Sequence, residues 1–154
     1  MKRYLYLILP LIIFLSGCKK DDPEPEDQSV EVSFNFSKGL DAKSSNDYEC
    51  FDGEGDYAYV VISGEEYYLD VFYLYGTPYT RSIMLPTQGT YILEEFMLMY
   101  DNNTPGIETD DTVIMAAPHT GSDFAAFVET PLHYTFVAQE YNVIEISIQV
   151  VCYE

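Results

Sequence analysis

An alternation of apolar and polar residues dominates this 154-residue chain from Val30 onward. In the segment 30–37, two valines and two phenylalanines occupy every second position and alternate with Glu, Ser, Asn and Ser. Because successive side chains of a β-strand point to opposite faces, a period of two predicts a strand with one buried face. No long segment after Val30 has the period near 3.6 that a helix requires. An all-β fold is therefore expected.

The same alternation, interrupted by turn-forming residues, marks the other expected strands. These cover residues 57–62, 67–75, 79–85, 91–100, 113–116, 132–138 and 143–151. The polar residues 38–55 are expected to form a long loop. Seven or eight short strands without a long helix predict a single antiparallel β-sandwich over residues 30–154.

Three details of this pattern give finer predictions. In the strand 67–75, every second residue from Tyr67 to Tyr75 is expected on one face. The apolar positions of the strand 91–100 skip one place, which predicts a β-bulge at Glu94–Glu95 that keeps both acids out of the core. Residues 121–127 are expected to make one or two helical turns with Ser122 as the N-cap.

The first 17 residues have the layout of an export signal. Lys2 and Arg3 precede an apolar stretch, 4–15, that is too short to span a bilayer. It ends in Leu-Ser-Gly-Cys18, which resembles the lipobox of bacterial lipoproteins. The resemblance implies a signal peptide over 1–17 and a palmitate-bearing Cys18 that anchors the chain in the outer membrane. The alternative is an ordinary secretory leader with an incidental cysteine.

Residues 18–29 form an acidic tether that contains prolines, a composition that keeps a chain extended. Its start, Cys18-Lys-Lys-Asp-Asp, resembles the export signal of Bacteroidetes surface lipoproteins. This resemblance implies that the domain faces the cell exterior. The alternative is a merely soluble tether and a domain that faces the periplasm.

The net charge limits the partners. The chain has a formal charge of −19, from 26 acidic and seven basic residues, and loss of Lys2 and Arg3 with the leader would make it −21. Binding to nucleic acid needs a positive surface, so nucleic acid is excluded as a partner. Electrostatic docking on an anionic membrane is excluded on the same ground, which leaves the lipid as the expected membrane contact.

Three sequence pieces in the second half, taken together, resemble a domain of Bacteroidetes cell-surface proteins. They are Leu85-Pro-x-x-Gly-x-Tyr-x-Leu-x-x-Phe96, then Ala117-Pro-x-x-Gly-Ser122, then Thr130-Pro-Leu132. That family has a prealbumin-like (transthyretin-like) sandwich, so the expected sandwich is prealbumin-like or immunoglobulin-like. The resemblance covers about 85–151 and implies a non-catalytic surface module without catalytic residues. Residues before Leu85 depart from any such pattern.

Two cysteines remain when Cys18 carries the lipid. In an oxidising envelope, the pair Cys50 and Cys152 is expected to form a disulfide that braces the long loop against the last strand. The alternative is a buried free Cys152 and a loop Cys50.

No metal or cofactor is expected. Residues 52–56 carry acids at alternate positions, as a calcium loop does, and 101–111 is a second oxygen-rich loop, but the remaining ligands of an EF-hand are missing. Solvated acidic loops are the favoured interpretation. His119 and His133 lack a third ligand at zinc spacing and are interpreted as surface residues.

Two side chains and one modification site stand out as candidates. Tyr68 and Phe72 lie on the face of their strand opposite Leu69, and large aromatics on an outer face suit recognition of a glycan or a protein. The alternative is that the many tyrosines serve only as good strand formers. Asp111-Thr112-Val resembles the O-glycosylation site of Bacteroidetes envelope proteins, which implies a glycan on Thr112.

The sequence contains no nucleophile elbow, no metalloprotease motif and no phosphate-binding glycine loop, so we do not expect an enzyme. The expected function is that of a lipid-anchored, non-catalytic binding or accessory module for a glycan or an envelope protein. The alternatives are a purely structural subunit or spacer of an envelope assembly and, more remotely, an enzyme.

Overall fold

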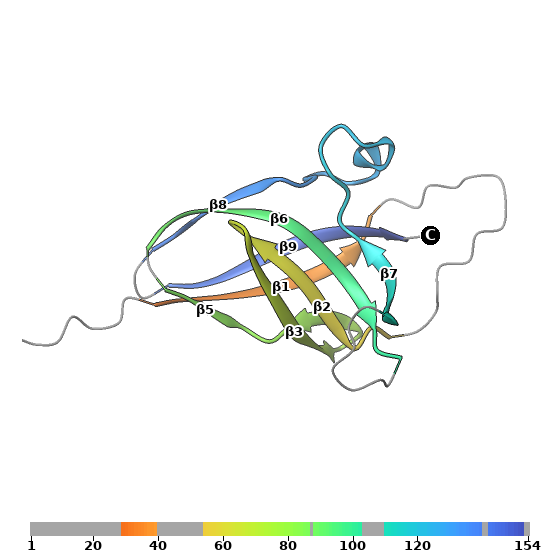
Figure 1. The fold of residues 1–154 in the computed structure, drawn as a ribbon, viewed down its shortest axis with the longest axis horizontal. Helices are drawn as coiled ribbons and strands as arrows, with labels where there is room; N and C mark the ends of the chain where they lie inside the picture. The colour runs from red at the N-terminus through yellow and green to blue at the C-terminus, as the bar shows by residue number, and fades with distance from the viewer. Residues whose placement is uncertain (1–28, 40–53, 87, 103–109, 140–141, 153–154) are drawn as a thin grey trace, which may run out of the picture.

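The computed structural model describes residues 29–39, 54–86, 88–102, 110–139 and 142–152, which form nine β-strands and one short 3-10 helix (Figure 1). The strands are β1 Val30–Lys38, β2 Tyr57–Ile62, β3 Glu65–Leu74, β4 Thr77–Thr80, β5 Ile83–Leu85, β6 Gly89–Tyr100, β7 Thr112–Ala116, β8 Tyr134–Ala138 and β9 Val143–Cys152. The 3-10 helix η2 covers Asp123–Phe127. The all-β prediction is confirmed.

Seven of the strands close into a ring. Their order is β2-β3-β4-β1-β9-β7-β6, and β6 pairs again with β2. β1 and β9 pair in parallel over eight residue pairs, whereas the other pairings between strands are antiparallel. The structure therefore corrects the predicted antiparallel sandwich to a closed barrel with one parallel pair. Strand pairing between the two ends of a chain leaves no local sequence signal, so the alternation could not reveal it.

β5 and β8 extend the barrel at one end. β5 pairs with the first residues of β1, on the edge that β4 uses further along, and β8 pairs with the first half of β6, on the edge that β7 uses further along. Figure 1 shows β5 and β8 on opposite sides of the molecule. At this end the fold has two layers and comes nearest to the predicted sandwich.

The gap between β4 and β5 contains a buried polar contact. The prediction had one strand over 79–85, but the structure breaks it at Arg81–Ser82. Next to the break, the Thr80 hydroxyl accepts a hydrogen bond of 3.0 Å from the backbone N–H of Phe34. Thr80 is only 2% exposed, so this side chain satisfies a buried donor of β1 where no β-ladder partner does.

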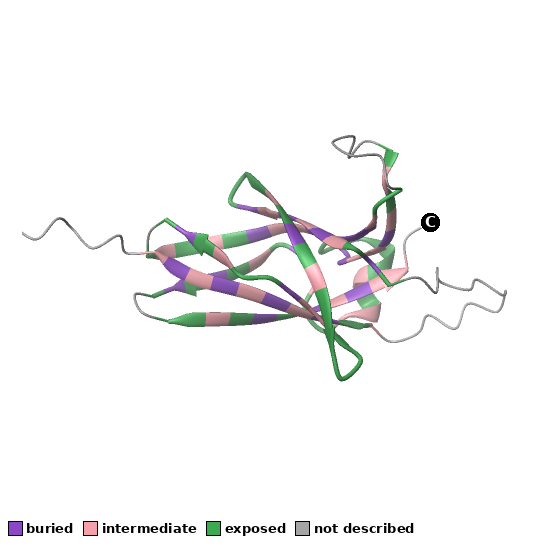
Figure 2. Cartoon of the chain, turned by 90° about the horizontal axis from the view of Figure 1, so that it is seen from below, coloured by how far each residue is buried: buried purple, intermediate pink, exposed green. Residues whose placement is uncertain are grey.

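The core lies inside the ring and follows the predicted alternation (Figure 2). On β1 the residues Val30, Val32, Phe34 and Phe36 are all buried, and the Phe96 ring of β6 packs against Phe34 and Phe36, with ring centroids 5.7 and 5.4 Å apart. β9 has the same pattern, with Ile146, Ile148 and Val150 buried.

The bulge predicted at Glu94–Glu95 is confirmed. Val61 of β2 pairs with Glu95, but the next residue, Ile62, pairs with Leu93, so Glu94 is the extra residue of β6. Leu93 and Phe96 both point into the core as a result.

Two local predictions need correction. The inward face of β3 ends at Val71, because Tyr75 is fully exposed in a two-residue turn with Gly76, in which both residues have positive φ. Ser122 does precede η2, but its side chain makes no capping hydrogen bond to the helix. Its hydroxyl donates instead to the carbonyl oxygen of His119, because a serine can bond to nearby backbone groups outside a helix as well.

Candidate binding surface

Three tyrosines form a cluster on the outer face of β2 and β3. The residues Ser63 and Gly64 both have positive φ and make the two-residue turn typical of a tight hairpin. This turn sets the register that places Tyr59 directly opposite Tyr68. The Tyr68 ring lies 5.3 Å from the Tyr59 ring and 6.0 Å from the Tyr57 ring, between centroids. We call Tyr57, Tyr59 and Tyr68 the tyrosine cluster.

Carboxylates contact the hydroxyl groups of the two cluster tyrosines that lie on β2, Tyr57 and Tyr59. The Tyr57 hydroxyl donates to Asp111 Oδ2 over 2.6 Å, and Tyr59 donates to the Glu66 carboxylate. Burial raises the pKa of Tyr59 to about 12, helped by that hydrogen bond and by the negative charges of Glu66 and Glu95. These contacts restrain two of the three rings of the tyrosine cluster.

Two carboxylates border the tyrosine cluster at one end. Val61 of β2 pairs with Glu66 on β3 and with Glu95 on β6, so the two acids flank it from neighbouring strands. With strands spaced about 4.8 Å apart, their backbones are about 10 Å apart. Directly paired residues of neighbouring strands project to the same face, so both acids lie on the outer face with Val61 and Tyr59.

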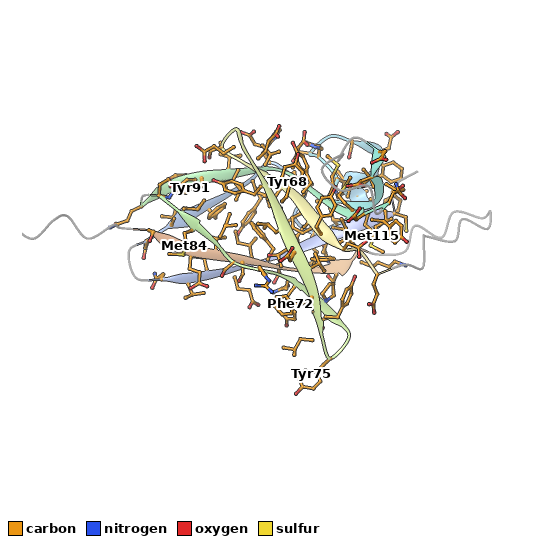
Figure 3. The ribbon with its side chains drawn as sticks, turned by 60° about the horizontal axis from the view of Figure 1, so that its bottom comes forward. Tyr68, Phe72, Tyr75, Met84, Tyr91 and Met115 are labelled. Carbon is orange, nitrogen blue, oxygen red and sulfur yellow. The ribbon has the colours of Figure 1, made fainter. Side chains whose placement is uncertain are left out.

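A second aromatic pair lies further along β3. Phe72 stacks on Tyr79 of β4, with ring centroids 5.8 Å apart and planes inclined by 19°. Phe72 is four residues beyond Tyr68 on the same face of β3, about 13 Å away along an extended strand. Between them, Asp70 forms an exposed ion pair of 3.2 Å with Arg81. Figure 3 shows Tyr68 and Phe72 along one strand and Tyr75 at the tip of the hairpin.

Both predicted binding residues are exposed, Tyr68 by 51% and Phe72 by 47%. The prediction missed the partners that make each of them part of a cluster, namely Tyr57, Tyr59 and Tyr79. The sequence did contain a signal for these partners, because the two hairpin turns determine which residues of neighbouring strands lie opposite each other. A two-residue turn at Ser63-Gly64 pairs Tyr59 with Tyr68, and one at Tyr75-Gly76 pairs Phe72 with Tyr79.

The two acidic loops come together in the part that the structure describes. Asp56 Oδ2 accepts the backbone N–H of Asp101 over 3.0 Å, and Asp111 Oδ1 accepts that of Asn102 over 3.2 Å. These carboxylates thus stabilise loop backbone. Among the described residues, no group of three or more His, Cys, Asp or Glu side chains is placed to hold a metal ion. Asp52 lies outside those residues.

The other sequence candidates are placed as follows. His119 and His133 are exposed and pack edge to face, with ring centroids 5.4 Å apart, although 14 residues separate them. Thr112 is exposed at the start of β7. Cys152 is half-buried at the end of β9, opposite Met115. Cys18 and Cys50 lie outside the described residues, so the lipid and the disulfide stay predictions.

A hollow of about 410 Å³ opens elsewhere, at the end of the barrel where β1 and β9 finish. Its apolar wall includes Phe36, Leu98 and Val150, and Lys38 and Glu54 contribute charged groups. No predicted site residue in the described part of the chain lines this hollow. No helix in the described part of the chain has the length and apolar character needed to cross a membrane.

No protein-family model matches the sequence, and no curated protein is significantly similar to it. A leucine-rich repeat protein from Bacteroides thetaiotaomicron contains a structurally similar region, with 15% identity and a TM-score of 0.44. The match covers 80% of this chain and 12% of that protein.

Proposed function

We propose that this protein is a lipid-anchored, non-catalytic binding module of the cell envelope, which recognises a glycan or a partner protein through the outer face of β3. The observation that carries the proposal is the tyrosine cluster together with the Phe72–Tyr79 pair. Tyr68 and Phe72 are each about half-exposed, and each packs against tyrosine rings of a neighbouring strand, so two aromatic groups lie on one face. Rigid, exposed aromatics are typical of recognition surfaces.

The envelope location is part of the same proposal. It is supported by the lipobox at Cys18, by the acidic tether and by the export-type residues that follow the cysteine. We infer an anchor in the outer membrane and a domain that faces the exterior. The prealbumin-like family remains the proposed relationship for the second half of the chain, from Leu85 to Val151.

The first experiment tests binding in intact cells. The wild-type protein and the variants Tyr68→Ala, Phe72→Ala and Tyr75→Asn would be crosslinked through their lipid anchor and purified with whatever they contact. We expect the captured glycan or protein to be lost from Tyr68→Ala and Phe72→Ala and retained by Tyr75→Asn. Tyr75 is the matched control because it is a fully exposed aromatic outside both clusters.

Thermal unfolding of each variant shows whether a loss of binding reflects a loss of fold. Cross-strand aromatic pairs contribute about 1 kcal/mol, so all three variants should stay folded. Capture that is equal in all four proteins would contradict recognition by β3 and favour a structural subunit or spacer. Digestion of the domain by protease added to intact cells tests the exterior location, and protection until lysis would place the domain in the periplasm.

A further inference from the structure

We propose that the occupant of the tyrosine cluster is an arginine-bearing segment of a partner protein, with one arginine seated over Val61 between Glu66 and Glu95. This inference rests on the proposed binding function and names the chemical class of the ligand. It follows from how aromatic rings and carboxylates are combined on one face of β2, β3 and β6.

Charge selects the partner. Carboxylates border the tyrosine cluster on two sides: Glu66 and Glu95 lie at the Val61 end, and Asp70 and Asp111 lie at the other. Within the described ranges the basic residues are Lys38 and Arg81, and Arg81 is already paired with Asp70. A neutral partner that covered the Val61 end would remove water from Glu66 and Glu95 without supplying a positive charge, which is costly. A cationic partner supplies the compensation.

The space over Val61 has the chemistry that an arginine side chain needs. Val61 is half-buried and aliphatic, so it can pack against the methylene stem. Glu66 and Glu95 stand on either side of it, and the ring of Tyr59 is the next outward side chain on the same strand. A guanidinium group can stack on tyrosine and donate to a carboxylate at the same time, which a lysine ammonium does less well.

The rings of Tyr59 and Tyr68 then bind the rest of the segment. They are 5.3 Å apart, and Tyr68 is half-exposed, so they form a continuous apolar surface beside the arginine position. The combination of a cation site and an aromatic surface suits an extended peptide or loop. It does not suit an acidic glycan, which the carboxylates would repel.

The test uses the full chain in detergent and two acetylated, amidated pentapeptides, Gly-Arg-Gly-Arg-Gly and its citrulline analogue. Citrulline has nearly the shape of arginine but no charge. Binding would be measured by calorimetry at two salt concentrations. A neutral oligosaccharide, cellohexaose, serves as the competing ligand class.

The decisive comparison is between two double variants that remove the same charge. Glu66→Gln with Glu95→Gln alters the proposed site, and Asp123→Asn with Glu129→Gln alters exposed acids near η2. We expect the first to weaken arginine-peptide binding by about tenfold or more, because charge-assisted hydrogen bonds are lost. The second should change it by less than about twofold, because distant exposed charges are screened. Tyr68→Ala should weaken binding, and Phe124→Ala, another exposed aromatic, should not.

Three results would overturn the inference. The first is equal weakening by both double variants, which would mean attraction to net charge alone. The second is equal binding of the arginine and citrulline peptides, or no detectable binding of either peptide. The third is binding of cellohexaose that depends on Tyr68 but not on Glu66 and Glu95. That third result would leave the proposed binding function intact, whereas capture in cells that is unchanged by Tyr68→Ala and by Phe72→Ala would contradict the function itself.

Discussion

Three side-chain hydroxyl groups make specific hydrogen bonds in this barrel, one in the core and two on the outside. Thr80 links β4 to β1 at the point where the edge of β1 passes from β4 to β5, and its hydroxyl accepts the buried N–H of Phe34. The Tyr59 and Tyr67 hydroxyls instead donate to carboxylates on β3, Glu66 and Glu65. Each of these residues looks like an ordinary strand former in the sequence, so its role could not be predicted from residue type.

Replacement of Thr80 by valine should destabilise the fold. Valine has the same shape but no acceptor, which would leave the buried N–H of Phe34 unsatisfied at a cost of about 1–3 kcal/mol. Thr80→Ser is the matched control: it keeps the oxygen and loses a methyl group, at about 0.8 kcal/mol. Urea unfolding measures both. If Thr80→Val were as stable as Thr80→Ser, the hydrogen bond would not have the importance assigned to it.

Stability should fall as the pH rises from about 10 to 12. Burial is the main cause that raises the pKa of Tyr59 and of Tyr67 to about 12 in the folded state, against 10.0 for an ordinary tyrosine. The folded state therefore holds these protons more tightly, and the stabilisation is present in full below pH 10 and lost as the pH passes 12.

The double variant Tyr59→Phe with Tyr67→Phe should have a shallower loss of stability over that range. Denaturant midpoints between pH 9 and about 12, with the ultraviolet absorbance of tyrosinate followed in parallel, provide the measurement. Tyr75→Phe is the control, since this side chain is fully exposed in a turn. An unchanged slope in the double variant would contradict the assignment.

At the scale of elements, the strands themselves were predictable and their breaks only in part. Alternation located β1, β2, β6 and β9 closely because each buries one face against the core. The bulge at Glu94 was predictable for the same reason, since two buried residues three apart in a strand require an extra residue between them. The split between β4 and β5 was not, because it depends on how both strands share one edge of β1.

Deletion of Glu94 should leave the fold intact. Without this residue, only Glu95 separates Leu93 from Phe96, so both still point into the core, and Val61–Glu95 and Ile62–Leu93 become consecutive pairs of a regular ladder. Deletion of Met97, which lies where β6 pairs regularly with β2, should instead turn the side chains beyond it to the opposite face and prevent correct folding. Near-ultraviolet circular dichroism and resistance to protease distinguish the two. Loss of the native signal in the Glu94 deletion would show that the bulge is needed for more than the alternation.

At the scale of the whole molecule, the closure of the barrel and the full candidate surface were beyond the sequence pattern. The ring depends on β1 meeting β9, and the binding surface depends on side chains from β2, β3, β4 and β6. Tyr68 and Phe72 could be selected because they lie on the polar side of an alternating strand. Their neighbours could be found only from strand register, which in turn depended on recognising both two-residue turns.

The predicted Cys50–Cys152 bridge is a property of the whole molecule as well. It would tie the loop before β2 to the end of β9, and closure of about 100 residues is expected to stabilise the fold by about 4–5 kcal/mol. Thiol labelling of the unreduced, denatured protein should find neither cysteine reactive, and Cys152→Ala should lower the unfolding temperature. Detection of two reactive thiols would contradict the bridge.

The parallel pairing of β1 with β9 has a consequence for biogenesis. The first strand of the described domain has its most extensive pairing with β9, which contains the last ten described residues, so the barrel cannot close before β9 has been synthesised. Native contacts between distant parts of a chain also form slowly. The export proposed above would therefore move a chain whose barrel stays open until β9 has crossed the membrane, and an open chain is the state that passage through a narrow pore requires.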